Sequence, residues 1–181
     1  RSGKPISTPQ EFAEVSSFDL SSDGRKVVSS RSDAQTGDSL WVTDLERNTT
    51  SRLMFDTTAI FPVFAPDGEK VAFVSRTSLY IMPADGSGKA EEVLKDAPNT
   101  FLSQWSPDGR YLIYSTAGDL YALPVQGERK PIPLVAGKPN ELTGAVSNDG
   151  RWLAYLSDAT GQNEVYIQAF PEPRGKWMVS V

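Results

Sequence analysis

Four near-copies of a five-residue turn constrain this chain more than any other feature. They are Ser21-Ser22-Asp23-Gly24-Arg25, Ala65-Pro66-Asp67-Gly68-Glu69, Ser106-Pro107-Asp108-Gly109-Arg110 and Ser147-Asn148-Asp149-Gly150-Arg151. The Asp residues follow one another at steps of 44, 41 and 41 residues. A fixed period in this range indicates a repeat architecture, in which each unit buries its apolar faces only against its neighbours.

The turn residues fit one hairpin geometry. A type I turn favours Ser at its first position, Pro at its second and Gly at its fourth. Gly takes the left-handed conformation without a Cβ clash, and the Asp carboxylate accepts hydrogen bonds from nearby backbone N–H groups. The spacing puts each Asp on a separate unit, so the four carboxylates are not expected to converge on a metal or an acid–base site. We therefore assign a structural turn role to Asp23, Gly24, Asp67, Gly68, Asp108, Gly109, Asp149 and Gly150.

Each unit contains four short segments rich in β-branched and aromatic residues, which is typical of strands. In the second unit these segments are residues 60–64, 70–75, 78–82 and 91–94, and residues 31–39 of the first unit read as a polar loop. A continuous apolar run such as Val71-Ala72-Phe73-Val74 needs cover on both faces of its sheet. Small sheets stacked around an axis provide that cover. The sequence predicts an all-β propeller with four visible blades of four antiparallel strands.

The blade boundaries follow from the turn positions. We expect blades at residues 17–58, 59–99, 100–140 and 141–181. Residues 1–16 are rich in Pro and Ser, and they are either a linker or the outer strand of a preceding blade.

Composition narrows the classes of function. The net charge is −5 with acids and bases interspersed, which argues against a nucleic-acid partner because phosphate binding requires a basic face. No apolar run reaches the length of a membrane span, and no signal peptide is visible at Arg1. The chain contains neither Cys nor His, so the commonest general base and metal ligand is missing. We predict no cofactor, no metal and no catalytic residues.

Two short motifs resemble known chemistry but lack its other parts. Gly37-Asp38-Ser39-Leu40 spells a lipase-type nucleophile motif, yet an activated Ser needs a base within hydrogen-bond reach and the chain has no His. Gly86-Ser87-Gly88-Lys89 lacks the upstream Gly and the downstream Ser or Thr of a phosphate-binding loop. Core packing is the expected role of the four tryptophans, with a sugar-stacking platform as the alternative: Trp41, Trp105, Trp152 and Trp177.

The turn Ser-Pro-Asp-Gly-Arg followed by an aromatic-aliphatic strand resembles the WD-like repeats of TolB-type β-propellers, over essentially residues 17–181. The last unit also resembles the extracytoplasmic propeller of bacterial eukaryotic-like serine/threonine kinases. The matching segments are Asn148-Asp149-Gly150-Arg151-Trp152-Leu153-Ala154-Tyr155, Asn163-Glu164-Val165-Tyr166-Ile167 and Gly175-Lys176-Trp177. This resemblance implies a sensor or interaction propeller on a larger membrane protein, outside the cytoplasm. The chain itself shows no kinase motif.

Blade number separates this chain from the resembled family, whose propellers usually have six blades. A closed four-bladed ring is allowed. We favour a portion of a larger propeller of about six blades. An open stack would leave apolar faces on the first and last blades, so such a stack either needs a partner or is prone to association through these faces.

A binding surface is expected on loops that a rigid scaffold positions. In a propeller, the loops between the second and third strands share one rim with the connections between blades. The polar residues there that we select as ligand-contacting candidates are Arg31, Asp33, Asp38, Arg76, Asp158 and Asn163. The alternative for each is an ordinary solvated side chain.

The leading functional hypothesis is a non-enzymatic module that binds a protein or a small ligand and senses it for an attached domain. The alternative is the gating propeller of a serine peptidase similar to prolyl oligopeptidases. That alternative requires an α/β-hydrolase domain with a nucleophile elbow, which these residues do not contain.

Overall fold

The structure is a computed structural model that describes residues 14–33, 37–54, 58–137 and 139–180. These residues form four antiparallel sheets of four strands each, and the strand order in every sheet follows the chain. The strands of the first two sheets are β1 (Glu14–Leu20), β2 (Lys26–Asp33), β3 (Gly37–Asp44), β4 (Thr49–Met54), β5 (Ala59–Phe64), β6 (Lys70–Ser75), β7 (Ser78–Pro83) and β8 (Glu91–Leu94). The strands of the last two are β9 (Phe101–Trp105), β10 (Tyr111–Thr116), β11 (Asp119–Pro124), β12 (Ile132–Val135), β13 (Glu141–Val146), β14 (Trp152–Ser157), β15 (Glu164–Ala169) and β16 (Trp177–Met178).

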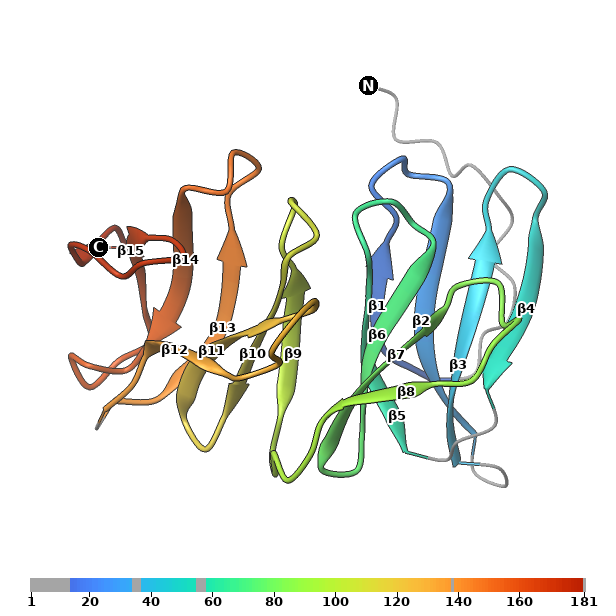
Figure 1. The fold of residues 1–181 in the computed structure, drawn as a ribbon, viewed down its shortest axis with the longest axis horizontal. Coiled ribbons are helices and arrows are strands. Elements are labelled where there is room, and N and C mark those ends of the chain that lie inside the picture. Colours follow the sequence, from blue (N-terminus) through green and yellow to red (C-terminus); the bar gives the residue numbers. More distant parts are fainter. Residues whose placement is uncertain (1–13, 34–36, 55–57, 138, 181) are drawn as a thin grey trace.

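In Figure 1 the third and fourth sheets occupy the left half of the molecule, and the first and second sheets overlap in the right half. The first strands of consecutive sheets are neighbours, because β1 contacts β5, β5 contacts β9 and β9 contacts β13. The prediction of an all-β fold built from four-stranded antiparallel blades is confirmed. The described residues contain no helix that could cross a membrane.

Every sheet has two distinct faces, set by the alternation of side chains along a strand. We call the face that points toward the preceding sheet the front face, and the opposite one the back face. In the first sheet, the back face is the one that packs against the second sheet. The front faces of the last three sheets carry a cross-strand aromatic pair at equivalent positions. The ring centroids lie 5.6, 5.6 and 5.8 Å apart in Phe73–Tyr80, Tyr114–Tyr121 and Tyr155–Tyr166.

The core is divided among three apolar clusters, one at each junction of consecutive sheets. At the first junction Val28 and Leu40 meet Val71 and Phe73. The second cluster joins the back of the second sheet to the front of the third through residues that include Ala72, Val74, Leu79, Leu112 and Tyr114. The third joins the last two sheets through residues that include Ile113, Leu120, Leu153 and Tyr155. The apolar run of β6 is therefore buried on both faces, as its sequence predicts.

The four repeated turns share two hydrogen bonds made by backbone N–H groups, and three of the turns add a bond from a Ser hydroxyl to the Asp, which Ala65 cannot make in the second copy. In the third copy the N–H of Gly109 donates to the carbonyl of Ser106 at 2.8 Å, and Gly109 has a φ of 75°. The Oγ of Ser106 donates to Oδ1 of Asp108 at 2.6 Å, and the N–H of Arg110 donates to the same oxygen at 3.0 Å. The Asp side chain thus caps its own turn, which leaves its carboxylate engaged in the hairpin.

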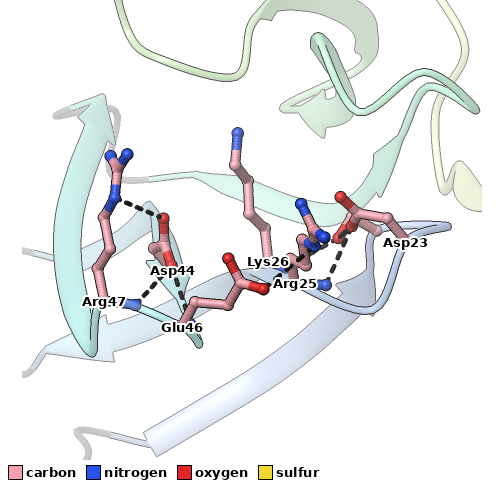
Figure 2. Close-up of polar contacts among 7 residues, drawn as sticks. Asp23, Arg25, Lys26, Asp44, Glu46 and Arg47 are labelled. Carbon is pink, nitrogen blue, oxygen red and sulfur yellow. Dashed lines mark hydrogen bonds and ion pairs between the residues drawn. The ribbon is translucent and has the colours of Figure 1, made fainter.

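In each sheet the repeated turn, which joins the first strand to the second, lies on the same edge as the turn that joins the third strand to the fourth. We call this edge the turn rim. In the first sheet the N–H of Leu45 donates to the carbonyl of Arg25 at 2.8 Å. Figure 2 shows the ion pair beside this bond, in which Arg25 Nε lies 3.2 Å from Glu46 Oε1. Both side chains are exposed, so the pair adds little stability. The backbone bond recurs in the other three sheets, between Ala84 and Glu69, Val125 and Arg110, and Phe170 and Arg151.

Two strand boundaries differ from expectation. The first strand begins at Glu14, which pairs with Ser32, while residues 1–13 lie outside the described residues. The bounds of the polar loop predicted at residues 31–39 are wrong, because residues 31–33 belong to β2 and residues 37–39 belong to β3. Backbone pairing continues there through polar residues, which carry no apolar alternation for a sequence reading to detect.

The expectation that all four tryptophans pack in the core is wrong for two of them. Trp105 is buried, and Trp41 is half-buried on the front face of the first sheet. Trp152 and Trp177 are 41% and 52% exposed, because they lie on the back face of the fourth sheet, which no other sheet of the described residues covers. The predicted last strand at residues 177–181 is shorter in the structure, where β16 ends at Met178.

Candidate functional site

We call the edge of the sheets opposite the turn rim the loop rim. It carries the turn between the second and third strands of each sheet and the connections between sheets. Hydrogen bonds tie these two kinds of segment together. The N–H of Ala97 donates to the carbonyl of Thr77 at 2.8 Å, and the N–H of Glu141 donates to the carbonyl of Gly118 at 2.7 Å. The Oγ1 of Thr116 donates to the carbonyl of Pro98 at 2.6 Å. The loop rim is therefore a hydrogen-bonded scaffold that can present side chains to a ligand.

A hollow of about 590 Å³ opens on this rim between the third and fourth sheets. We call it the rim hollow, and its lining includes Phe101, Thr116, Gly118, Glu141 and Leu142. Phe101 is 38% exposed and Leu142 is 46% exposed, whereas their neighbours in β9 and β13 are largely covered. Two large apolar side chains thus border a concave surface that is open to solvent.

The aromatic wall of the rim hollow extends to the second sheet. The rings of Phe61 and Phe101 have centroids 4.4 Å apart and are tilted by 50°. Phe61 has a φ of 51°, which is rare for a bulky residue. This contact joins the starts of β5 and β9, and it places Phe101 between two sheets.

A buried acid lies at the base of the rim hollow. Glu141 is 1% exposed, and its Oε1 accepts a hydrogen bond from Ser157 Oγ at 3.2 Å. Burial raises the pKa of Glu141, and the Ser157 hydrogen bond and the charge of Lys176 only partly oppose this effect. Within the described part of the chain, Glu141 Oε2 and the hydroxyl of Tyr155 are buried without a hydrogen-bond partner. Burial, and then the charge of Glu141, raise the pKa of Tyr155 to about 12.

The turn that borders the hollow requires glycine. Ala117 and Gly118 have φ values of 52° and 86°, which suits a two-residue hairpin turn with two left-handed residues. A Cβ at Gly118 would lie 2.7 Å from Oδ1 of Asn140. Asn140 is held in turn by Asp158, whose Oδ1 and Oδ2 accept its N–H at 2.7 Å and its side-chain Nδ2 at 2.8 Å. These hydrogen bonds lower the pKa of Asp158, so this residue is an anchor of the rim.

The six residues selected from the sequence are distributed over three sheets and are not gathered at the rim hollow. On the front face of the first sheet, Arg31 Nε donates to Ser29 Oγ at 3.2 Å. Asp33 is the last residue of β2, and Asp38 lies in β3 and bridges to Thr58. The other three are Arg76, which is exposed between β6 and β7, and Asp158 and Asn163, which flank the turn between β14 and β15.

Sequence reasoning missed the apolar lining of the hollow and the buried acid. Seven residues before each turn Asp, the last three units carry Ile60, Phe101 and Leu142. That column signals an apolar rim, but only polar residues of the loops were selected as ligand-contacting candidates. Glu141 occupies the position that Ala59 and Thr100 fill in the two preceding units, where both are also buried. An acid at a position otherwise small and buried was the available signal.

The rim hollow offers apolar contact surface with a hydroxyl group at Thr116. Its volume lies in the range of pockets that bind small molecules or peptide side chains. Within the described residues, no group of three acidic side chains is placed to hold a metal ion. The arrangement suits the binding of an apolar group.

Comparison with known proteins relates the chain to solved structures only. No protein-family model and no curated protein matches the sequence. TolB from Acinetobacter baumannii superposes with a TM-score of 0.80 at 18% identity, covering 93% of this chain and 44% of that one. A putative TolB from Agrobacterium tumefaciens gives 0.81 at 19% identity, covering 93% of this chain and 62% of that one. A prolyl endopeptidase gives 0.68 at 19% identity, covering 96% of this chain and 30% of that one.

These similarities show that the chain has a TolB-like β-propeller fold. At such identities they concern the fold alone, because one propeller scaffold serves many unrelated functions. The chain spans less than two thirds of the length of either TolB protein.

Proposed function

We propose that this chain is a non-enzymatic propeller module that binds a protein segment or a small ligand at the rim hollow. The observation that carries the proposal is the exposure of Phe101 and Leu142 around a hollow of about 590 Å³. An exposed apolar cluster in a concave, hydrogen-bonded frame is a feature of binding sites. Binding there would cover both side chains without reordering the rim.

The chemistry of the hollow favours an apolar anchor with a hydrogen-bonding group beside it. The ring of Phe101 packs against the tilted ring of Phe61 and is therefore held in place, so little side-chain entropy is lost when a ligand contacts it. The hydroxyl of Thr116 already donates to Pro98, which leaves its oxygen as an acceptor for a ligand N–H or O–H. A peptide segment with one aromatic or aliphatic side chain meets both requirements.

We further propose that the module senses its ligand for an attached domain and acts outside the cytoplasm. Support comes from the resemblance of the last unit, above all residues 148–155 and 163–167, to the propellers of bacterial eukaryotic-like kinases. The similarity of the fold to TolB proteins is consistent with this proposal.

The binding proposal is tested with a phage-displayed library of random peptides selected on the purified chain. Peptides that enrich are expected to bind the wild type and to lose at least tenfold in affinity with Leu142→Asp or Phe101→Ser. Leu45→Asp is the matched control, because Leu45 is 37% exposed but lies on the turn rim. Equal loss with the control, or enriched peptides indifferent to both hollow substitutions, would contradict a binding site in the rim hollow.

A second candidate function is the gating propeller of a serine peptidase, which the similarity to a prolyl endopeptidase favours. The gene that encodes the chain distinguishes the two. A kinase domain and a membrane span support the sensor, and an α/β-hydrolase domain supports the peptidase. For the chain alone, we expect no hydrolysis of ester, peptide or glycoside substrates. Hydrolysis that one loop-rim substitution abolishes would overturn the non-enzymatic proposal.

A further inference from the structure

Two buried oxygen atoms without hydrogen-bond partners among the described residues lie at the junction of the third and fourth sheets. They are Oε2 of Glu141 and the hydroxyl of Tyr155, and these residues are 1% and 2% exposed. Glu141 lies opposite Ser157 in the pairing of β13 with β14, and Tyr155 comes two residues before Ser157. Because side chains alternate along a strand, all three point to the front face of the fourth sheet.

The fold does not require polar groups at this place. In the second sheet the equivalent positions hold Ala59 and Phe73, which are fully buried in the apolar cluster of the first junction. Ala59 pairs with Ser75 as Glu141 pairs with Ser157. A buried carboxylate or hydroxyl costs free energy unless it is hydrogen-bonded, and a ligand that supplies donors removes this cost. The polar groups of the fourth sheet are therefore suited to recognition.

The charges around Glu141 favour a cation. Burial raises the pKa of Glu141, and the charges of Asp119 and Asp158 add to this rise. The hydrogen bond from Ser157 and the charge of Lys176 oppose it. Three carboxylates thus act on one place, and a positive charge brought there interacts favourably with each of them.

Glu141 belongs both to this junction and to the lining of the rim hollow. Its carboxylate accepts one hydrogen bond from Ser157 Oγ at 3.2 Å, which is long for two oxygen atoms. The ammonium of Lys176 lies over the rings of Tyr166 and Tyr155, at 4.3 and 5.7 Å from their centroids. Lys176 therefore acts on Glu141 through its charge and leaves Oε2 without a partner. A ligand in the hollow meets an acid that is weakly held.

We propose that the rim hollow binds ligands that carry a primary ammonium group beside an apolar group. This inference rests on the proposed binding function of the hollow and names the chemistry of its ligand. The apolar group packs against Phe101 and Leu142, and the ammonium donates to Glu141 and Tyr155. An ammonium has three N–H donors, so it supplies a partner to both buried atoms. The amino terminus of a peptide and the side chain of a lysine both have this chemistry.

The test is an NMR titration of the isotope-labelled chain with phenethylamine and with phenethyl alcohol, in which a hydroxyl replaces the ammonium. At neutral pH the amine is expected to bind about tenfold more tightly, as one hydrogen bond to a charged group provides. Glu141→Gln should remove this preference and Tyr155→Phe should reduce it. Phe101→Ser should weaken the binding of both probes, and Leu45→Asp on the turn rim should change neither.

The preference for the amine is expected to depend on pH. The pKa of Glu141 is raised, so its carboxylate ionises at a higher pH than an ordinary glutamate, and the ionised form binds the ammonium. The affinity for the amine should therefore rise from about pH 5 to about pH 8, while the affinity for the alcohol stays constant. A rise of the same size in Glu141→Gln would contradict the assignment of this residue.

Two peptides distinguish the sources of the ammonium. One has a free amino terminus on a phenylalanine, and the other is acetylated at its amino terminus and carries a lysine beside a leucine. Tighter binding of the first identifies an amino terminus as the ligand group, and tighter binding of the second identifies a lysine. Acetylation of the remaining amine is expected to weaken the preferred peptide about tenfold.

Equal affinities of the wild type for amine and alcohol, or an amine preference that Glu141→Gln retains, would overturn the inference. If Phe101→Ser still weakens both probes, the proposed binding function stands, so the two failures are distinguishable. Binding of neither probe would overturn the inference and leave the peptide selection to decide the proposed function. Lys176→Gln removes a cation that acts on Glu141, so weaker amine binding in this variant would also count against the inference. Circular dichroism verifies that each variant is folded.

Discussion

The stacking of the sheets makes a quantitative prediction for one substitution placed at two equivalent positions. Ile81 and Ile167 occupy the same site on the back faces of the second and the fourth sheet, opposite Ala72 and Ala154. Ile81 is 6% exposed and belongs to the apolar cluster against the third sheet. Ile167 is only half-buried, because none of the other described sheets covers it.

The expected costs differ because only one site is closed. Replacing Ile81 by Ala removes three buried carbon groups, each worth about 0.8 kcal/mol of transfer free energy. The cavity that remains adds to this loss, so we expect Ile81→Ala to cost about 3–4 kcal/mol. At Ile167 about half of the transfer term applies and water fills the space, so we expect Ile167→Ala to cost about 1 kcal/mol.

The assay is urea unfolding of dilute protein followed by tryptophan fluorescence. The free energies of unfolding are compared at unchanged slope, so that the difference reports stability and not the compactness of the unfolded state. We expect Ile81→Ala to be the less stable variant by about 2 kcal/mol. Equal losses, or a larger loss for Ile167→Ala, would refute the reasoning that a following sheet covers one site and not the other.

Three further predictions concern the loop rim and the turns. Burial raises the pKa of Glu141, so its contribution to stability is present at low pH and is lost as the pH rises above the ordinary pKa of a glutamate. Urea midpoints measured at about pH 4 and about pH 8 should therefore show the wild type losing stability relative to Glu141→Gln as the pH rises. Gly118→Ala should cost about 1–3 kcal/mol of stability from its left-handed backbone, and the contact of the new Cβ with Asn140 should add to this cost. Gly109→Ala has open space around its Cβ, so it should show the backbone cost alone in the same assay. The hydrogen bond from Ser147, together with Arg151, lowers the pKa of Asp149 to about 2. The stability advantage of the wild type over Asp149→Asn should therefore be present at neutral pH and disappear as the pH falls toward about 2, and a constant advantage in thermal melts across that range would contradict it.

The repeated turns made the sheet architecture predictable because their residues have local causes. Gly109 adopts a conformation that Gly tolerates best, and Asp108 bonds within its own turn, so the signal does not depend on the rest of the chain. The burial of the Val71–Val74 run on both faces could also be predicted, because a short continuous apolar run in a strand is typical of a strand covered on both faces.

The candidate site was less predictable because it depends on where the sheets end in space. Phe101 and Leu142 were not among the candidates selected from the sequence, and the packing of the third sheet against the fourth leaves them on an open rim. Asp158 read as a ligand-contacting residue, but its carboxylate is bonded to Asn140, eighteen positions away. Trp152 and Trp177 show the same limit, because exposure is set by the presence or absence of a neighbouring sheet.

Amide hydrogen exchange read by mass spectrometry tests the stacking most directly. Central strands that are covered on both faces should open only with the whole domain, whereas strands of an end sheet have one face free and should open more easily. In dilute protein we predict the slowest exchange in β6, β7, β10 and β11, and faster exchange in β2, β3, β14 and β15. Exchange in the two end sheets as slow as in the two middle sheets would contradict a stack of four sheets packed front to back.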